Sequence, residues 1–255
     1  MENEKLFGSF AKHVVTRNLK EFKAQGISNI VWAYSKADHK DEKLFRAFVD
    51  KYIKIKGTKD FKTQAILNAL FSFSNFDLID LILPHCREML QNLKSNREPL
   101  ILEGQFQLTQ ILAELNHTCG KEGIEIANSF DLNSLITMDL AQYHKKESKS
   151  SNFHKEVSQI IEKNLKIEIK NEYEAIKGFF VDIYIPNLNG EKVIISVDGP
   201  FHYKSETSKI ETHSSKTTKR ILTKAGFKVI SYSYHDDKLY KSKEKQIQFI
   251  KNLLK

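Results

Sequence analysis

The sequence predicts a chain of two parts, in which α-helical hairpin repeats form an α-solenoid and a small α/β domain follows. Three observations support this fold class. Apolar residues of the first half recur at helical spacing with few turn signals. A fourteen-residue motif occurs twice in that half. In the second half, two β-branched runs bracket an Asn/Gly turn, as in a hairpin. We expect repeats over residues 1–141, a linker over 142–152 and the α/β domain over 153–255.

The repeated motif occupies residues 22–35 and again residues 61–74, at a period of 39. Six of the fourteen aligned positions are identical: Phe, Lys, Gln, Ile, Asn and Ser. A second amphipathic segment follows each copy, at residues 42–55 and 78–93. A period near 39 with two helices per unit is typical of helical-hairpin solenoids. A third, weaker copy is expected at residues 108–115. The alternative is chance similarity between amphipathic helices.

Two polar side chains recur within the motif. Gln25 and Asn29 lie one helical turn apart, and Gln64 and Asn68 repeat the pair in the second copy. Polar pairs on successive helices are a way in which repeat proteins read exposed RNA bases. Gln25 and Gln64 are therefore candidate RNA contacts. The alternative is that these side chains form hydrogen bonds between repeats.

The α/β domain begins after a polar, serine-rich linker. Ser151 or Asn152 would cap a helix over residues 153–165, which has an apolar stripe at helical spacing. Glu156 lies beside this stripe, and it either flanks the helix or points along the sheet towards two aspartates. The remaining elements alternate in the order β-β-β-α-β-α. Their expected ranges are strands at 166–172, 178–185 and 193–198, a helix at 216–225, a strand at 227–233 and a helix at 238–254.

Each strand of the predicted hairpin carries one aspartate, Asp182 or Asp198. Two carboxylates brought to one end of a sheet repel each other unless a cation, a proton or hydrogen-bond donors offset the charge. In nucleases that cation is Mg²⁺, which prefers hard oxygen ligands. Asp182 and Asp198 are thus candidate metal ligands. The alternative is that Asp182 lies at a strand edge in water and Asp198 caps the following Gly-Pro turn.

The positive charge of the chain is concentrated at its end. Residues 201–255 contain 13 Lys and Arg against 5 Asp and Glu, whereas residues 1–200 contain 27 of each. A basic segment attached to a balanced body is typical of a polyanion-binding surface, because each lysine that meets a phosphate releases a condensed counterion. The alternative is a solvated lysine-rich helix that aids solubility.

Several other classes of protein are disfavoured. No apolar run approaches the roughly 20 residues that span a bilayer, so we expect no membrane partner. The first residues predict neither a secretory signal nor a transit peptide, which favours an intracellular, cytoplasmic location. Cys86 and Cys119 have no Cys or His at zinc-ligand spacing, so reduced thiols are expected.

Three features of the α/β region occur together: Ser-Val-Asp-Gly-Pro-Phe-His at residues 196–202, the run at residues 217–230, and the closing lysine-rich helix. In this combination the region resembles the RAP domain. The resemblance extends back to residues 153–157 and 181–183, and covers roughly residues 151–255. It implies a restriction-endonuclease-like fold preceded by octotricopeptide, heptatricopeptide or FAST-kinase-like helical repeats.

The same resemblance implies a function in RNA metabolism. It implies binding to single-stranded or structured RNA, with roles in RNA processing, RNA stability or ribosome assembly. The ribosome or another RNA–protein complex is then an expected partner, and a mitochondrial or other organellar location is implied for a eukaryotic source. Binding of RNA would require no cofactor.

The candidate RNA-binding residues follow the hairpin or lie on the next helix. They are His202, Tyr203, Lys204, Lys216, Lys219, Arg220 and Lys224. The helical spacing of the last four would form one basic strip against phosphates, and His202 or Tyr203 could stack on an unpaired base. The alternatives are that His202 hydrogen-bonds to Asp198 and that Tyr203 packs in the core.

A metal-dependent nuclease acting on RNA or DNA is the alternative function. The endonuclease-like pattern has an Asp, and on the next strand an acid, one residue and a lysine. Asp182 matches the first position, but Ser196 stands where the acid is expected and Asp198 where the lysine is expected. Lys219 could replace that lysine in space, and Mg²⁺ would need Asp182, Asp198 and Glu156. The sequence therefore predicts RNA binding without catalysis, with the nuclease as the alternative.

Overall fold

The fold was obtained as a computed structural model, which describes residues 2–96, 99–137, 151–238 and 242–255. The chain divides into two compact units, Met1–Met138 and Asp139–Lys255. Each unit buries hydrophobic residues of its own. Residues 142–150 of the predicted linker lie outside the described residues. Within the described ranges, no helix has the length and apolar character needed to cross a bilayer.

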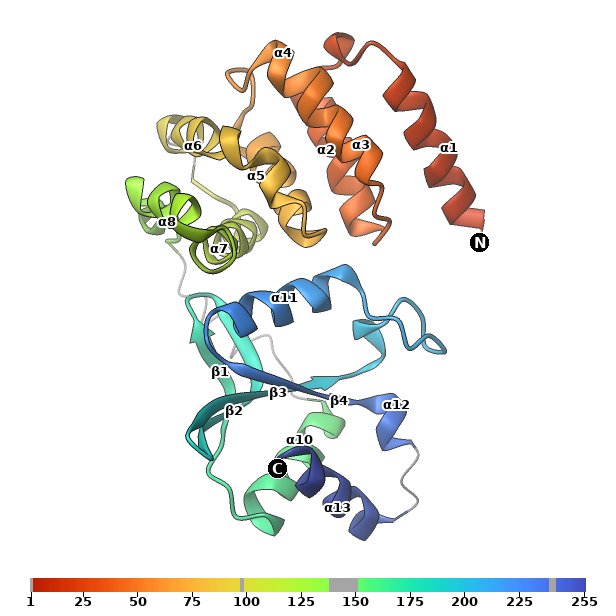
Figure 1. The fold of residues 1–255 in the computed structure, drawn as a ribbon, viewed down its shortest axis with the longest axis vertical. Helices are drawn as coiled ribbons and strands as arrows, with labels where there is room; N and C mark the ends of the chain where they lie inside the picture. Colours follow the sequence, from red (N-terminus) through yellow and green to blue (C-terminus); the bar gives the residue numbers. More distant parts are fainter. Residues whose placement is uncertain (1, 97–98, 138–150, 239–241) are drawn as a thin grey trace. The chain divides into compact units, whose positions relative to one another are not determined.

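The first unit is helical, as predicted (Figure 1). A π-helical segment, Phe48–Ile53, joins two of its helices into one continuous rod. Its α-helices are α1 (Glu2–Thr16), α2 (Ala24–Lys36), α3 (Glu42–Ala47), α4 (Lys54–Lys56), α5 (Thr63–Asn75), α6 (Ile79–Asn96), α7 (Leu102–His117) and α8 (Gly120–Ser129).

Helices α2 and α5 are the two copies of the sequence motif, and they pack against each other. Equivalent apolar positions face the core in both copies: Ile27 and Ile66 are fully buried, as are Val31 and Leu70. Helix α5 packs in turn on α7, which contains residues 108–115 of the expected third copy. The helices that follow begin at Glu42 and Ile79, within one residue of the starts expected from the sequence.

A row of amides joins the three packed helices. Asn68 of α5 donates a hydrogen bond to Asn29 Oδ1 of α2 at 3.2 Å, and Gln107 of α7 donates to Asn68 Oδ1 at 3.3 Å. Successive members of this amide ladder (Asn29, Asn68, Gln107) are 39 residues apart. Gln25 and Gln64 donate to the ladder asparagines of their own helices at 2.8 Å. Gln25 and Gln64, the predicted RNA contacts, thus take part in the hydrogen bonds of this ladder.

The second unit combines a four-stranded sheet with helices. Its first helix continues as a π-helical segment, Ile160–Asn164. The elements are α10 (Asn152–Gln159), β1 (Lys170–Ile176), β2 (Phe179–Leu188), β3 (Glu191–Asp198), α11 (His213–Lys224), β4 (Lys228–Ser233), α12 (Tyr234–Asp237) and α13 (Lys243–Leu253). The predicted order of helices and strands is confirmed, with the short α12 added.

The strands lie in the order β1-β2-β3-β4, with β4 parallel to β3 and the other pairs antiparallel. Helix α11 covers one face, and α10 and α13 cover the other (Figure 1). Successive side chains along the strands point to opposite faces, so the strands contribute to the apolar core on each face of the sheet. Ile195 packs on the α10 and α13 side, whereas Ile194 packs with Leu222 of α11. Each helix is therefore held to its face by apolar packing.

Three predicted starts were wrong by three residues or more. Strand β1 spans Lys170–Ile176 instead of residues 166–172, and Lys166 takes a left-handed backbone conformation with φ +56° before it. Helix α11 begins at His213 instead of residue 216, because the Thr212 hydroxyl caps it by accepting from the Ser215 N–H. The last helix begins at Lys243, after a Ser242 cap, and α12 precedes it.

Candidate functional site

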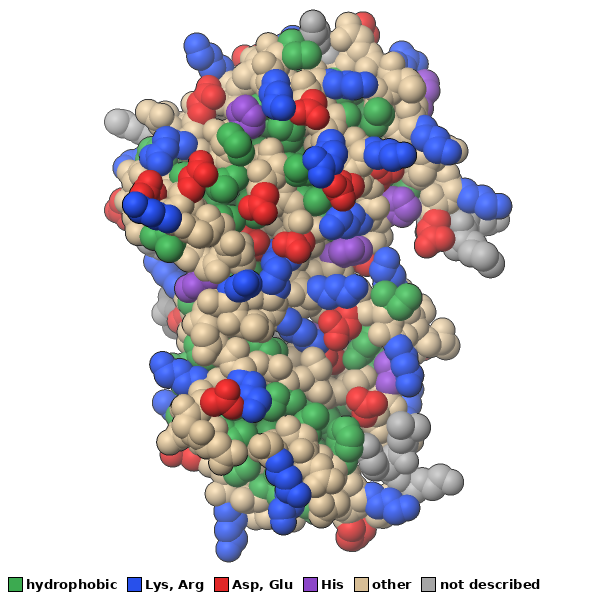
Figure 2. Space-filling model, viewed as in Figure 1, with side chains coloured by type: hydrophobic (Ala, Val, Ile, Leu, Met, Phe, Trp, Pro, Cys, Tyr) green, Lys and Arg blue, Asp and Glu red, His purple; other side chains and the backbone are tan. Residues whose placement is uncertain are grey.

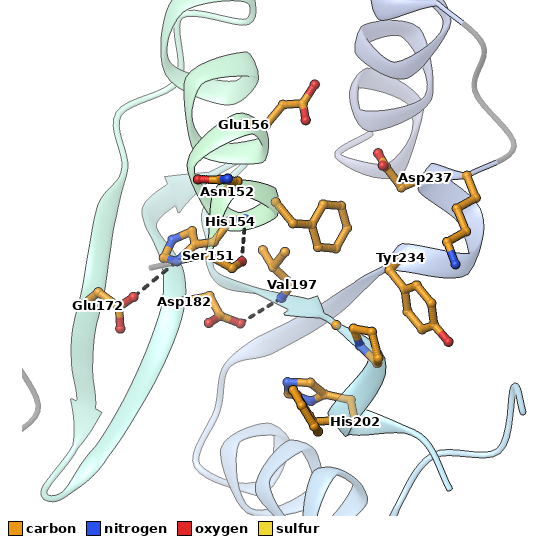
Figure 3. A pocket seen from close by; sticks show the side chains of 15 residues that line it. Ser151, Asn152, His154, Glu156, Glu172, Asp182, Val197, His202, Tyr234 and Asp237 are labelled. Carbon is orange, nitrogen blue, oxygen red and sulfur yellow. Dashed lines mark hydrogen bonds and ion pairs between the residues drawn. The ribbon is translucent and has the colours of Figure 1, made fainter. Parts of the chain in front are cut away.

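Polar side chains converge at the end of β3, around two cavities of about 670 Å³ and 260 Å³. Asp182 and His202 line both cavities. Asp182 lies on β2 beside the paired residues Ile183 and Ile195, and its Oδ2 accepts the N–H of Val197 at 2.8 Å (Figure 3). This bond fixes the carboxylate at the boundary of the two cavities.

His154 of α10 forms a wall of the larger cavity. It is buried, with Nδ1 3.2 Å from Glu172 Oε1 and Nε2 3.0 Å from Asn171 Oδ1 (Figure 3). Burial alone lowers the pKa of His154. The hydrogen bond with Glu172 and the charge of Asp182 outweigh burial, so the pKa is raised above its ordinary value. Glu172 itself lies within β1 at φ +49°, a backbone conformation that is costly for a residue with a side chain.

Burial is also the main influence on Asp182. It raises the pKa of this carboxyl, because a desolvated carboxylate is costly. The Val197 N–H and the nearby His154 and His202 lower the pKa, but they do not cancel the effect of burial. The larger cavity therefore holds an acid and a base whose protonation states depend on each other.

A second cluster surrounds Asp198, which is fully buried. Lys219 Nζ of α11 lies 2.5 Å from Asp198 Oδ2 and 2.9 Å from Glu211 Oε1. Ser196 donates to Asp198 Oδ1 at 2.6 Å. Burial lowers the pKa of Lys219, but the bonds to its two carboxylates raise it further, so the pKa lies above its ordinary value. This cluster is a closed ion-pair network between sheet and helix.

The candidate metal ligands are not brought together as one donor set. Asp182 bonds to Val197, whereas Asp198 is neutralised by Lys219. Glu156 is exposed and points away from Asp182 (Figure 3). Among the residues that the structure describes, no three His, Cys, Asp or Glu side chains are grouped so that they could hold a metal ion. As placed, these residues do not fit a Mg²⁺ ion.

The predicted aromatic contacts differ in accessibility. Tyr203 is buried and donates to Ser233 Oγ at 2.7 Å, so its ring is not available to a base. The His202 side chain is 38% exposed, and its Nδ1 lies 3.4 Å from Asp198 Oδ1 and 3.2 Å from Ser215 Oγ. Tyr203 therefore takes its alternative position in the core, whereas His202 lies beside Asp198 and stays partly exposed.

The predicted basic residues fall into two groups. The side chain of Lys219 is only 17% exposed, and Arg220 is partly buried. Lys204, Lys216 and Lys224 are exposed. The proposed strip on α11 is thus reduced to Lys216 and Lys224 at its surface, and Lys219 attaches the helix to the sheet.

Sequence reasoning missed three residues of this site. Glu172 and Glu211 were not selected because their partners, His154 and Lys219, come from other elements. Phe201 belongs to the RAP-like motif but is not among the predicted contacts, yet its side chain is 97% exposed and lines the larger cavity. An aromatic residue within a Gly-Pro turn was the available signal.

A RAP domain is detected at residues 195–253, where the model of that family matches the chain. The match covers about a quarter of the chain and runs from β3 into α13. It includes Asp198, His202 and Lys219 and is consistent with RNA binding. No curated protein matches the chain. The helical unit and residues 153–194 lie outside the match, so the predicted likeness of the repeats to known families stays a prediction.

Proposed function

We propose that this chain is an RNA-binding protein that contacts phosphates through its α/β unit. One observation carries the proposal: the RAP domain match coincides with the segment in which the excess of positive charge lies. Residues 201–255 have 13 Lys and Arg against 5 Asp and Glu. Lysines that neutralise phosphates release counterions, which supplies affinity without sequence preference.

The geometry of α11 supports this assignment. Lys216 and Lys224 are exposed and lie eight residues apart, which is a little more than two helical turns. They therefore project from similar sides of the helix. Lys219 lies between them and is bonded to Asp198 and Glu211. The helix holds the outer two about 12 Å apart along its axis, and the inner lysine fixes that helix to the sheet.

For the first unit, we propose an α-solenoid that extends the RNA contact. The packing of α2 on α5 and of α5 on α7 supports it, as does the 39-residue spacing along the amide ladder. Gln25 is exposed at one end of the ladder, where it remains accessible to a base. In this proposal the chain acts in RNA processing, RNA stability or ribosome-related RNA metabolism.

The test is RNA affinity as a function of salt, measured by fluorescence anisotropy with a labelled single-stranded RNA. Lys216→Gln/Lys224→Gln should weaken binding and reduce the slope of log K against log salt by about 0.7 per lost phosphate contact. The matched control is Lys155→Gln/Lys163→Gln, which removes two exposed lysines, also eight residues apart, on the opposite side of the sheet. Equal effects of the two double variants, or no RNA binding at low salt, would contradict the proposal.

The nuclease alternative is supported by one observation. Asp182, Ser196 and Lys219 line the same smaller cavity. Asp182 matches the first Asp of the endonuclease-like pattern, and Lys219 would replace in space the lysine whose position Asp198 occupies. Ser196 occupies the position at which the endonuclease-like pattern has its second acidic residue. Incubation with RNA and DNA substrates in Mg²⁺ or Mn²⁺ tests this function. Cleavage that is lost in Asp182→Ala and increased in Ser196→Glu would support it, and intact substrates throughout would contradict it.

A further inference from the structure

Phe201 is an aromatic ring held in water at the rim of the larger cavity. Its 97% exposure exceeds that of the next most exposed large hydrophobic residues, Leu6 and Ile101, at 66%. An isolated exposed apolar residue is ordinary, but one on the rim of a concave site is suited to ligand contact. The packing of its own unit therefore does not account for the position of this ring.

The backbone around Phe201 is anchored on both sides. Residues 200–202 form a 3₁₀ turn, in which the His202 N–H bonds to the Gly199 carbonyl at 3.1 Å. The His202 carbonyl accepts from the Thr212 N–H at 2.9 Å, and Tyr203 is buried. The exposed ring is consequently presented from a fixed turn, so little conformational entropy is lost when a flat ligand stacks on it.

Carboxylates outnumber basic side chains in the lining of this cavity, although the unit is basic. The lining contains Glu156, Glu172, Asp182 and Asp237 beside Lys238, His154 and His202. Carboxylates repel phosphate, but they accept hydrogen bonds from the N–H groups of a neutral ligand. Asp182 uses part of the acceptor capacity of Oδ2 for Val197, and an ionised carboxylate has about four acceptor positions. The cavity thus favours a neutral group with N–H donors over the phosphates that bind nearby lysines.

An unstacked nucleobase combines these properties, because it has a flat π-face and a polar edge. The volume of about 670 Å³ lies in the range of small-molecule sites. Among the bases, guanine presents two adjacent donors, N1–H and N2–H, which match the two oxygens of a carboxylate. Uracil presents one donor between two carbonyl acceptors, and these acceptors would face the acid unfavourably.

We propose that this cavity binds one unstacked guanine of a bound RNA, with Phe201 stacked on the base and the Asp182 carboxylate accepting from its N1–H and N2–H groups. The inference rests on the proposed RNA-binding function and adds a base preference to it. The lysines contact the backbone, and the acidic cavity reads one base.

The experiment uses the full chain and labelled oligouridine decamers that carry one central guanine, adenine or cytosine. We expect the unmodified chain to prefer guanine by at least about fivefold, the lower limit for a good bidentate base contact. Phe201→Ala should weaken binding of the guanine decamer about tenfold. Ile210→Ala is the matched control, since Ile210 is 58% exposed in the following loop and does not line the cavity. Asp182→Asn should abolish the preference for guanine over adenine.

The outcomes separate the two proposals. Equal affinity for the three decamers, or equal effects of Phe201→Ala and Ile210→Ala, would overturn the guanine site and leave RNA binding intact. Absence of binding to every decamer at low salt would overturn both. Because Asp182 also bonds to Val197, the Asn variant is first checked by thermal unfolding. If it fails to fold, the decamer preference and the Phe201 comparison still decide.

Discussion

The two units use their polar side chains in different ways. Residues 1–138 contain 18 Lys and Arg and 17 Asp and Glu, and the face drawn in Figure 2 shows these charges interspersed over the helical unit. The hydrogen bonds that join its helices include the neutral amide ladder and a bond from Ser74 of α5 to the buried Glu114 of α7 at 3.1 Å. Residues 139–255 contain 22 Lys and Arg and 15 Asp and Glu. There, Asp198 with Lys219 and Glu172 with His154 place charged partners inside.

The difference matches the proposed roles of the two units: the helical unit stacks its helices on each other, and the α/β unit binds the ligand. Neutral amides satisfy each other at equivalent positions of similar helices, so one ladder fixes the register of several helices at little desolvation cost. Buried charges are more costly and depend on a complete set of partners. In the α/β unit they occur where the sheet, α11 and the cavities meet, whereas Glu114 of α7 is bonded to the neutral hydroxyls of Ser74 and Thr118. We therefore expect the α/β unit to respond to charge substitutions and pH, and the helical unit to respond to the loss of amides.

The largest effect is expected for Lys219→Met. The substitution leaves Asp198 buried without its cation, and breaking a buried pair from one side costs about 3–5 kcal/mol of the free energy of unfolding. Urea unfolding measures the loss. The control is Lys216→Met on the exposed face of the same helix, with an expected change below about 0.5 kcal/mol. The double variant Asp198→Asn/Lys219→Met should recover much of the stability. Equal stability of Lys219→Met and Lys216→Met would show that the buried charge pair does not distinguish the two units.

A smaller loss is expected for Asn68→Ala in the amide ladder. Asn68 is buried and bonds to Asn29, Gln64 and Gln107. Its removal leaves polar partners unsatisfied, which costs about 2 kcal/mol in the free energy of unfolding. Gln25→Ala at the exposed end should cost less than about 0.5 kcal/mol. If Asn68→Ala keeps its stability but loses RNA affinity, the ladder reads bases instead of joining helices.

Tyr203→Phe should cost about 1 kcal/mol, the net value of one hydrogen bond, because it deletes the bond to Ser233. RNA affinity should stay unchanged, since the ring is buried. Thermal unfolding and anisotropy together measure the two quantities. Weaker RNA binding at unchanged stability would indicate instead that Tyr203 contacts RNA.

The smallest expected effect is on pH dependence. The folded state raises the pKa of His154 above its ordinary 6.5, so the protonated form is stabilised. This contribution is fully present below pH 6.5 and is lost as pH rises through the folded pKa. The free energy of unfolding should therefore decline over that interval, and His154→Gln should remove the decline. Glu172→Gln should move it to lower pH, and an unchanged profile in both variants would contradict the assignment.

The sequence predicted the elements that depend on local patterns. The motif at residues 22–35 and 61–74 predicted two helices that pack together, because identical spacing places equivalent apolar residues on one face. The order of strands and helices after residue 151 also followed from apolar runs and turns. The ladder position at Gln107 was missed, since the third copy was sought one residue later and its opening residues differ.

The site was less predictable because its partners are distant in sequence. Lys219 was considered as a replacement for a missing lysine, and the structure places it on Asp198. Nothing local paired Glu172 with His154, and the positive φ of Glu172 has no signal in its residue type. Tyr203 and Phe201 lie two residues apart, yet one is buried and the other exposed. The 3₁₀ turn at Pro200–His202 directs the Phe201 side chain outward and the Tyr203 side chain inward. The residue types alone do not predict these directions.

The parallel pairing of β3 with β4 has a consequence for biosynthesis. Strands β2 and β3 form a local hairpin, whereas β4 is synthesised only after the long segment that includes α11. Until β4 docks, β3 offers an open hydrogen-bonding edge to any neighbouring chain. Asp198 lies on that edge, and a charge directed inward discourages intermolecular strand addition. We expect this carboxylate to disfavour strand addition at the end of β3 until it pairs with Lys219, which precedes β4 in the chain.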